Sequence, residues 1–140
     1  MHKILVYFEP RTKIDRLSEF TMSLARQYHS QILALTVIKP PSAQKRNKVE
    51  EERAWKRLYE FEEDAFQYGI KISLLLEELE TINQKTLTGK IIDIASVYRV
   101  DLLILSNNAK INLKKLANSV TMPTIIIPYK NLNEHNERKG

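Results

Sequence analysis

The chain has 140 residues, of which 43% are hydrophobic and 28% charged, values ordinary for one globular domain with a single core. Its formal net charge is +5, and it contains no cysteine, which excludes disulfides, thiolate catalysis and thiolate metal sites. No apolar stretch approaches the roughly 18–20 residues of a membrane span, and no signal peptide is recognised, so we expect a cytoplasmic protein. The basic excess comes without a nucleic-acid-binding motif, and nucleic acid is not expected as a partner.

Apolar runs and amphipathic segments alternate from the start of the chain. Residues 3–8 predict a central strand. Apolar residues at helical spacing predict a helix over 14–29, with Asp15 or Ser18 as its N-cap. Gln31–Ile38 predicts a second strand, and its nearly unbroken aliphatic character indicates burial on both faces of a sheet.

A long helix is predicted over 49–68, after a polar loop over 42–48. The acidic run 50–52 suits its first turn, where the helix macrodipole favours anions, and Gly69 is expected to end it. One face carries aromatic residues beside an apolar stripe, and we expect that face to be core rather than a ligand platform. The stripe comprises Ala54, Leu58, Phe61, Ala65 and Tyr68, and the aromatic residues beside it are Trp55, Tyr59 and Phe66.

The second half of the chain continues the alternation. Its predicted elements are a strand over 70–76, a linker over 77–85, a helix over 87–98, a strand over 101–106, a short amphipathic helix over 111–120 and a strand over 124–128. Thr86 or Thr88 is the expected N-cap of the longer helix. The polar segment 129–140 is expected to be a disordered tail after a domain that spans residues 1–128.

Strands that alternate with helices predict an α/β fold, an open five-stranded parallel sheet with helices on both faces. Ligands bind such sheets beyond the carboxyl ends of the strands. Glu9 follows the first strand and therefore lies at that edge, whereas Asp101 begins its strand and lies at the opposite edge. The two carboxylates are not expected to cooperate.

The residues that carry most enzyme chemistry are scattered. The histidines are His2, His29 and His135, no two of which share a local motif, and there is no Gly-x-Ser-x-Gly elbow. We therefore predict neither a catalytic triad nor a metal site, and we do not expect an enzyme.

Glycine is scarce, which bears on phosphate binding. The three glycines, Gly69, Gly89 and Gly140, are too far apart to form a P-loop or a dinucleotide-binding fingerprint. Phosphate would have to be held by side chains, and the candidate donors that follow the fourth strand are Asn107, Asn108 and Lys110.

Three segments together resemble the universal stress protein family. Residues 4–9 are similar to that family's first strand, which ends in Val-Asp-Gly-Ser, with Glu9 in place of the aspartate. Residues 101–106 look like its Asp-Leu-Ile-Val-Met-Gly strand, and residues 118–127 look like its last helix end and closing strand. The resemblance spans about residues 2–128. It implies a five-stranded parallel sheet in the order 3-2-1-4-5.

The resemblance also implies what has changed in this chain. Family members that bind ATP carry a Gly-x-x-Gly-x9-Gly-Ser/Thr stretch after strand four. Here the segment 105–123 is several residues shorter, and Ser106 stands in place of the first glycine. We therefore expect no bound cofactor and no ATP held in the family's usual manner. The implied role is in a stress response, exercised through dimerisation and contacts with an unknown protein partner.

Two alternatives remain open. The first is a nucleotide sensor with a reworked, glycine-free phosphate site that suits AMP better than ATP. The resemblance places its pocket at Glu9, Val37, Ser106, Asn107 and Asn108, with Lys110 also near the phosphate. The second is an enzyme of the wider nucleotide-binding α/β group, for which the sequence offers no catalytic pair.

The resemblance further implies a homodimer that pairs antiparallel through the fifth strand. This strand comprises Thr124, Ile125, Ile126 and Ile127, and an apolar edge strand of this kind favours pairing with another chain. Pro128 would keep the paired stretch short. The alternative is a monomer whose tail 129–140 covers this edge.

Overall fold

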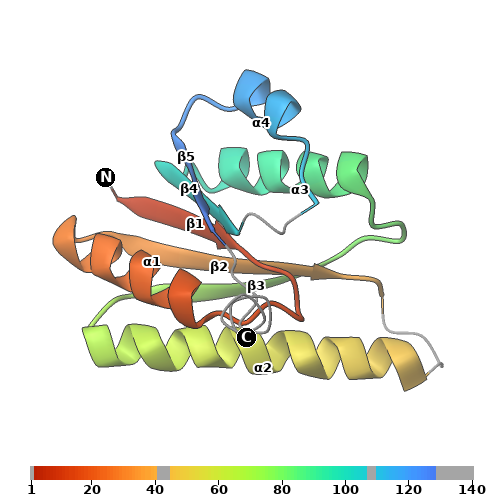
Figure 1. Cartoon of the computed structure of the whole chain (residues 1–140), viewed down its shortest axis with the longest axis horizontal. Coiled ribbons are helices and arrows are strands. Elements are labelled where there is room, and N and C mark those ends of the chain that lie inside the picture. The colour runs from red at the N-terminus through yellow and green to blue at the C-terminus, as the bar shows by residue number, and fades with distance from the viewer. Residues whose placement is uncertain (1, 41–44, 107–109, 129–140) are drawn as a thin grey trace, which may run out of the picture.

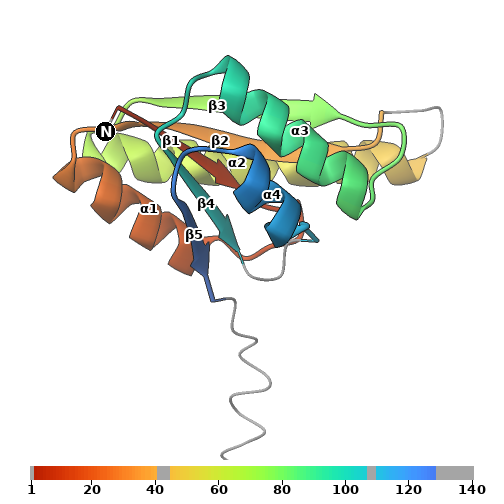
Figure 2. The same cartoon turned by 90° about the horizontal axis from the view of Figure 1, so that it is seen from above.

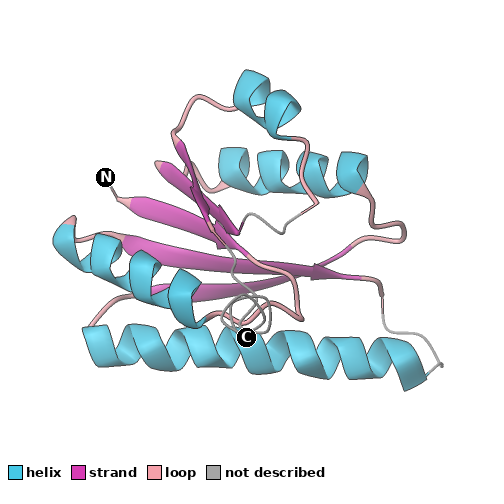
Figure 3. Ribbon diagram, in the orientation of Figure 1, coloured by secondary structure: helices cyan, strands magenta, loops and turns pink. Residues whose placement is uncertain are grey.

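The computed structural model describes residues 2–40, 45–106 and 110–128. Strands and helices alternate along them in the order β1 (Lys3–Tyr7), α1 (Asp15–Gln27), β2 (Gln31–Ile38), α2 (Lys45–Tyr68), β3 (Ile72–Glu78), α3 (Gln84–Val97), β4 (Leu102–Ser106), α4 (Leu113–Ser119) and β5 (Thr124–Ile127). The strands form one parallel sheet in the order β3-β2-β1-β4-β5 (Figures 1 and 3). The predicted α/β fold and its strand order are confirmed. Among these helices, none is both long and apolar enough to cross a membrane.

The sheet separates two hydrophobic cores. Helices α1 and α2 cover one face, and α3 and α4 cover the other (Figures 1 and 2). Along β1, Ile4 and Val6 point to the α1/α2 side while Leu5 and Tyr7 point to the α3/α4 side, as the two-residue period of a strand requires. All four are at most 1% exposed. Each large aliphatic side chain buried in this way stabilises the fold by about 1.5–3 kcal/mol.

Three helices end in the left-handed backbone conformation at the same edge of the sheet. The residues concerned are His29 after α1, Gly69 after α2 and Arg99 after α3, with φ of 53°, 69° and 53°. In each case the following backbone N–H turns back to a helical carbonyl, from Ser30 to Ala25 and from Ile70 to Ala65 at 2.8 Å, and from Val100 to Ala95 at 3.1 Å. Gly69 ends its helix as predicted, and the other two ends use basic residues where glycine is the usual choice.

Helix α2 and strand β3 are among the elements whose boundaries differ from the predicted ones. Helix α2 begins at Lys45 instead of 49, so the acidic run 50–52 lies beyond its first turn. Strand β3 extends to Glu78, although Glu77 and Glu78 were expected in a linker. An edge strand tolerates these charges because one of its sides faces solvent, and Glu77 pairs with Lys90 at 3.2 Å.

Helix capping also differs from the predicted pattern. Helix α3 begins one turn earlier, with Asn83 as N-cap, and Thr86 is the third residue of a capping box. The side chain of each of these two residues accepts a hydrogen bond from the backbone N–H of the other residue, both at 2.9 Å. Helix α1 has Ile14 as N-cap without a side-chain hydrogen bond, and the Ser18 hydroxyl donates instead to Asp64 of α2 at 2.6 Å.

The aromatic face of α2 is less buried than predicted. The apolar stripe packs as expected, and Phe61 stacks on Phe8 with ring centroids 5.0 Å apart. Trp55 is half-buried, but Tyr59 is 56% exposed and Phe66 85% exposed. The prediction of core is therefore wrong for these last two residues, because only a narrow stripe of this outer helix contacts the sheet.

Candidate ligand pocket at the carboxyl edge of the sheet

A pocket of about 500 Å³ opens where β1 and β2 end and α3 begins. The start of α3 and the end of β2 lie on the right of Figure 1. The residues that line the pocket come from distant parts of the chain. They meet because all strands of a parallel sheet run in the same direction, so the carboxyl ends of the strands lie at one edge. Its lining residues are Tyr7, Glu9, Pro10, Arg11, Val37, Ile38, Lys39, Glu50, Ile82, Asn83, Leu87 and Lys110.

Glu9 is the acidic group closest to the end of the central strand, and it is half-buried. Its carboxylate accepts a hydrogen bond from the backbone N–H of Lys110. Burial raises the pKa of this carboxyl, and the Lys110 ammonium and backbone N–H act in the opposite direction. The Glu9 carboxylate is therefore only partly exposed to water, and it is hydrogen-bonded to the segment that follows β4.

Cationic side chains surround the mouth of the pocket. Arg11, Lys39 and Lys110 line it and are exposed. Glu50 of α2 reaches across to Arg11, with 3.4 Å between Oε1 and Nη2, and the same oxygen accepts from Arg53 Nη1 at 3.0 Å. This pairing connects the start of α2 to the segment after β1 and holds one cation at the pocket rim.

The floor of the pocket is apolar. Tyr7, Val37 and Leu87 are each at most 3% exposed. Burial, and then the nearby charge of Glu9, raises the pKa of the Tyr7 phenol, which therefore stays neutral and deep in the site. An apolar floor under a rim of cations suits a ligand that has an apolar ring and an anionic group.

The sequence-predicted site residues are partly assembled here. Glu9, Val37 and Lys110 line one pocket. Ser106 ends β4 and is 5% exposed, but it does not line this pocket. Asn107 and Asn108 lie outside the described residues.

Sequence reasoning missed two cations of the pocket, Arg11 and Lys39. Both follow the ends of adjacent parallel strands, a signal that would have found them, because these strand ends meet at one edge of the sheet.

Other candidate groups lie elsewhere. Asp101 is at the opposite edge, as predicted, and its Oδ2 accepts the backbone N–H groups of His2 at 2.8 Å and Lys3 at 2.9 Å. His29 also lies at that opposite edge, at the end of α1, and His135 falls outside the described residues. Across residues 2–40, 45–106 and 110–128, no three His, Asp or Glu side chains are grouped to hold a metal ion.

Comparison with known proteins identifies the fold. No protein-family model matches the sequence, and no curated protein matches it. Among solved structures, a protein of the universal stress protein family from Burkholderia pseudomallei is similar, with a TM-score of 0.72 and 15% identity over 90% of this chain and 95% of that one.

Two similar structures contain nucleotides. The universal stress protein from Archaeoglobus fulgidus in complex with dAMP has a TM-score of 0.66 and 14% identity over 91% of this chain and 98% of that one. A universal stress protein family protein from Arabidopsis thaliana with AMP bound has a TM-score of 0.67 and 15% identity over 95% of both chains. The fold of this chain is therefore that of the universal stress proteins.

Proposed function

We propose that this chain is a universal-stress-protein-like module that binds an adenine mononucleotide in its carboxyl-edge pocket. The main support for this proposal is that Glu9, Val37 and Lys110 line one pocket, which has an apolar floor and cationic side chains at its rim. The AMP and dAMP found in proteins of the same fold support this choice over a protein that binds no ligand. The proposed role is in a cytoplasmic stress response and consists of binding without turnover.

Each part of the ligand has a proposed partner. The Glu9 carboxylate accepts hydrogen bonds from ribose hydroxyls, and the main chain at Val37 lies along the base. Lys110, Arg11 and Lys39 attract the phosphate. Because no glycine-rich loop is present to hold further phosphates, a monophosphate suits the pocket better than ATP.

The test is a calorimetric titration of the purified protein with AMP, ADP and ATP, after mass detection of any nucleotide that co-purifies with it. We expect saturable binding of AMP and no tighter binding of ATP. Glu9→Ala and Lys110→Gln should each weaken AMP binding about fivefold or more, as loss of a charge-assisted contact predicts. Lys114→Gln, which removes the same charge from the exposed face of α4, should leave it unchanged. Absence of nucleotide in both measurements would contradict the proposal.

A second candidate function is a homodimer that acts through protein contacts, with no nucleotide. Strand β5 pairs only with β4 among the described strands, and Ile126 on it is 36% exposed. We propose that β5 pairs antiparallel with β5 of a second copy, because an apolar edge strand favours such pairing. This dimer is compatible with nucleotide binding and becomes the first candidate function if the titrations show none.

A further inference from the structure

Strand β3 is the outermost strand of the sheet on the side opposite to β5 (Figure 2). Among the described strands it pairs only with β2, and the side of β3 that faces away from β2 is here called its outer edge. Proteins commonly protect such an edge with a short strand, a proline or a charge. Strand β5 has four residues between Pro123 and Pro128, whereas β3 has seven, with its charges confined to Glu77 and Glu78 at its end. The outer edge of β3 is therefore the longer and the less protected of the two.

The hydrogen bonds to β2 show which backbone groups point to the outer edge. Ile32 of β2 lies opposite Ile72 in the ladder and donates its N–H to the carbonyl of Lys71 at 2.9 Å. In a parallel pair the N–H and C=O of one residue point to the same side, and this direction alternates along the strand. Ile72, Leu74 and Leu76 therefore direct their backbone N–H and C=O groups away from β2, where an additional strand would pair with them.

An apolar hollow of about 530 Å³ lies beside this edge, between α2 and the start of β3. Tyr59 and Phe66 line it from the helix, and Ile70 and Ile72 line it from the strand side. The two aromatic residues are seven positions apart and share one face of α2, as helical geometry requires. Their large exposed fractions leave apolar ring surface available for a partner.

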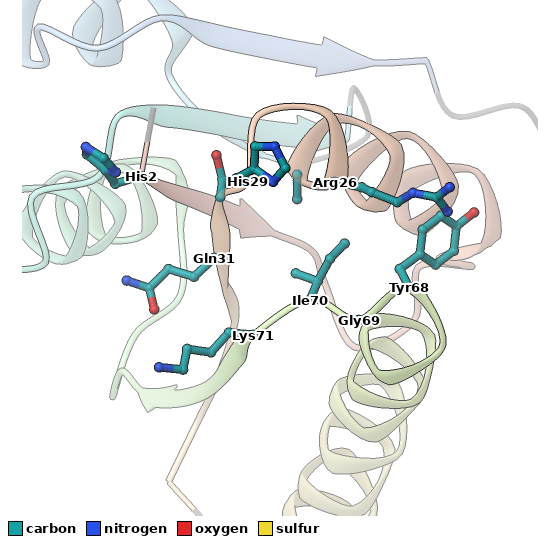
Figure 4. A pocket seen from close by; sticks show the side chains of 10 residues that line it. His2, Arg26, His29, Gln31, Tyr68, Gly69, Ile70 and Lys71 are labelled. Atoms are coloured by element: carbon teal, nitrogen blue, oxygen red, sulfur yellow. The ribbon is translucent and has the colours of Figure 1, made fainter.

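The turn from α2 into β3 holds Phe66 next to the edge. The backbone N–H of Gly69 donates to the carbonyl of Phe66 at 3.1 Å, and Ile70 follows directly (Figure 4). Tyr68 packs differently, because the Arg26 guanidinium of α1 lies 5.8 Å from the centroid of its ring (Figure 4). Tyr68 is thus covered by a neighbouring helix, whereas Phe66 remains open to solvent.

The surface around the hollow is acidic. Glu62 and Glu63 are exposed and line it together with the aromatic residues. The segment 58–80 contains seven acidic residues and one basic residue, Lys71, although the whole chain has a net charge of +5. A second copy of the same edge would bring like charges together, whereas lysine or arginine side chains would pair with these carboxylates. Charge therefore favours a basic occupant over a second copy of this chain.

We infer that the outer edge of β3 binds an extended segment of a partner protein that carries both apolar and basic side chains. The segment adds to the sheet as a further strand, and its main chain pairs with the outward backbone groups of β3. Its apolar side chains pack on Tyr59 and Phe66, and its basic side chains pair with Glu62 and Glu63. This surface lies apart from the carboxyl-edge pocket and from β5, and it depends on neither of those proposals.

The test is an NMR titration of the 15N-labelled full chain with a synthetic peptide that repeats Val-Val-Lys-Lys, so that each face of the extended peptide carries both kinds of side chain. A peptide that repeats Val-Val-Glu-Glu is the reference. We expect saturable amide shifts at Phe66, Ile72 and Leu74 with the lysine peptide, and at least about tenfold weaker binding of the glutamate peptide. Absence of saturable binding of the lysine peptide, or equal binding of both peptides, would overturn the inference.

Hydrogen exchange distinguishes strand addition from other contacts with the same surface. At saturating lysine peptide, the amides of Ile72, Leu74 and Leu76 should exchange at least about tenfold more slowly, because each N–H gains a hydrogen bond. Ser73 and Leu75 already direct their N–H groups to β2 and should change much less. Slowing that does not alternate along β3 in this way would contradict the addition of a strand.

Matched variants test the side chains. Phe66→Ala removes an exposed ring, so the protein should stay folded and bind the lysine peptide about fivefold or more weakly, whereas Phe20→Ala on the exposed face of α1 should leave binding unchanged. Glu63→Gln should weaken binding about twofold or more, and Glu19→Gln, also on α1, should not. Equal effects within either pair would exclude this surface. Concentration-dependent shifts of the β3 amides without peptide would identify a second copy as the occupant and also refute the inference.

Discussion

At the scale of single residues, Glu9 carries a charge that the folded state disfavours. Burial raises the pKa of its carboxyl against the opposing effect of Lys110. A group whose pKa is raised on folding stabilises the protein below its unfolded pKa, and this contribution is lost as pH rises through the folded pKa. At neutral pH the ionised Glu9 therefore reduces stability, which is consistent with a role in binding.

We predict that Glu9→Gln raises the melting temperature at about pH 7, because glutamine still accepts the Lys110 N–H but carries no charge. The gain should stay below about 1 kcal/mol, since the half-buried group is screened by solvent, and it should shrink towards pH 4. Thermal denaturation at both pH values measures it. Glu19→Gln makes the same change in net charge on the exposed face of α1, and an equal gain there would contradict this explanation.

Asp101 shows the opposite shift at the other edge of the sheet. The backbone N–H of His2, and then that of Lys3, lowers the pKa of its carboxyl. The ionised Asp101 therefore contributes to the free energy of unfolding above the unfolded pKa of about 3.9. This contribution is lost as pH falls through the lower pKa of the folded state.

Asp101→Ala should therefore lower the free energy of unfolding at about pH 7 by about 0.5–1 kcal/mol, the lower part of the range being favoured for an exposed group. Urea denaturation at neutral pH and below about pH 3 measures the change, and the difference from the wild type should narrow at the lower pH. Asp93→Ala, on the exposed face of α3, is the control, and an equal loss of stability there at neutral pH would contradict this explanation.

At the scale of the elements, the start of α3 depends on one residue. Asn83 caps the helix and exchanges hydrogen bonds with Thr86. Asn83→Ala should lower the free energy of unfolding by about 1 kcal/mol, because an orphan N–H is left at the helix end. Asn83→Asp keeps the acceptor and should remain close to the wild type in urea denaturation. Equal losses from both substitutions would show that the cap is not the cause.

Helices α1 and α2 are joined by a hydrogen bond between two side chains. The Ser18 hydroxyl, 2% exposed, donates to Asp64 at 2.6 Å. Ser18→Ala should lower the free energy of unfolding by about 1–2 kcal/mol, because it leaves the carboxylate of Asp64 without this donor. Ser23→Ala on the exposed face of α1 is the matched control, and denaturant unfolding that finds equal effects would contradict the prediction.

At the scale of the whole molecule, oligomeric state depends on β5, which pairs only with β4 among the described strands. Ile126→Asp should weaken the proposed dimer by about 2–3 kcal/mol, because pairing would bury an unpaired carboxylate. Sedimentation velocity over a concentration series measures the change. Leu113→Asp, which places the same charge at an exposed apolar position of α4, should not alter the oligomeric state. A dimer that survives Ile126→Asp, or a wild type that is always monomeric, would disprove pairing through β5.

Most of the fold was predictable because its signals are local. The aliphatic run Gln31–Ile38 has the same bounds in sequence and structure, since burial on both faces leaves no ambiguity about its length. Capping was harder to predict. Asn83 and Thr86 are three residues apart and both suit an N-cap, and only the geometry of the capping box assigns their roles. The exposure of Phe66 was likewise missed, because the spacing of apolar residues does not show how wide a face of the helix packs against the sheet.

By itself, the sequence determined the alternation of strands and helices, the parallel sheet, and the edge at which Glu9 lies, because these follow from periodicity and chain direction. Only the tertiary structure decided which charges meet. Arg11, Lys39 and Lys110 come together at the carboxyl edge, although many residues separate them along the chain. The physical reason is that each crossover returns the chain to the same edge, and which strand ends are neighbours there depends on the strand order of the folded sheet.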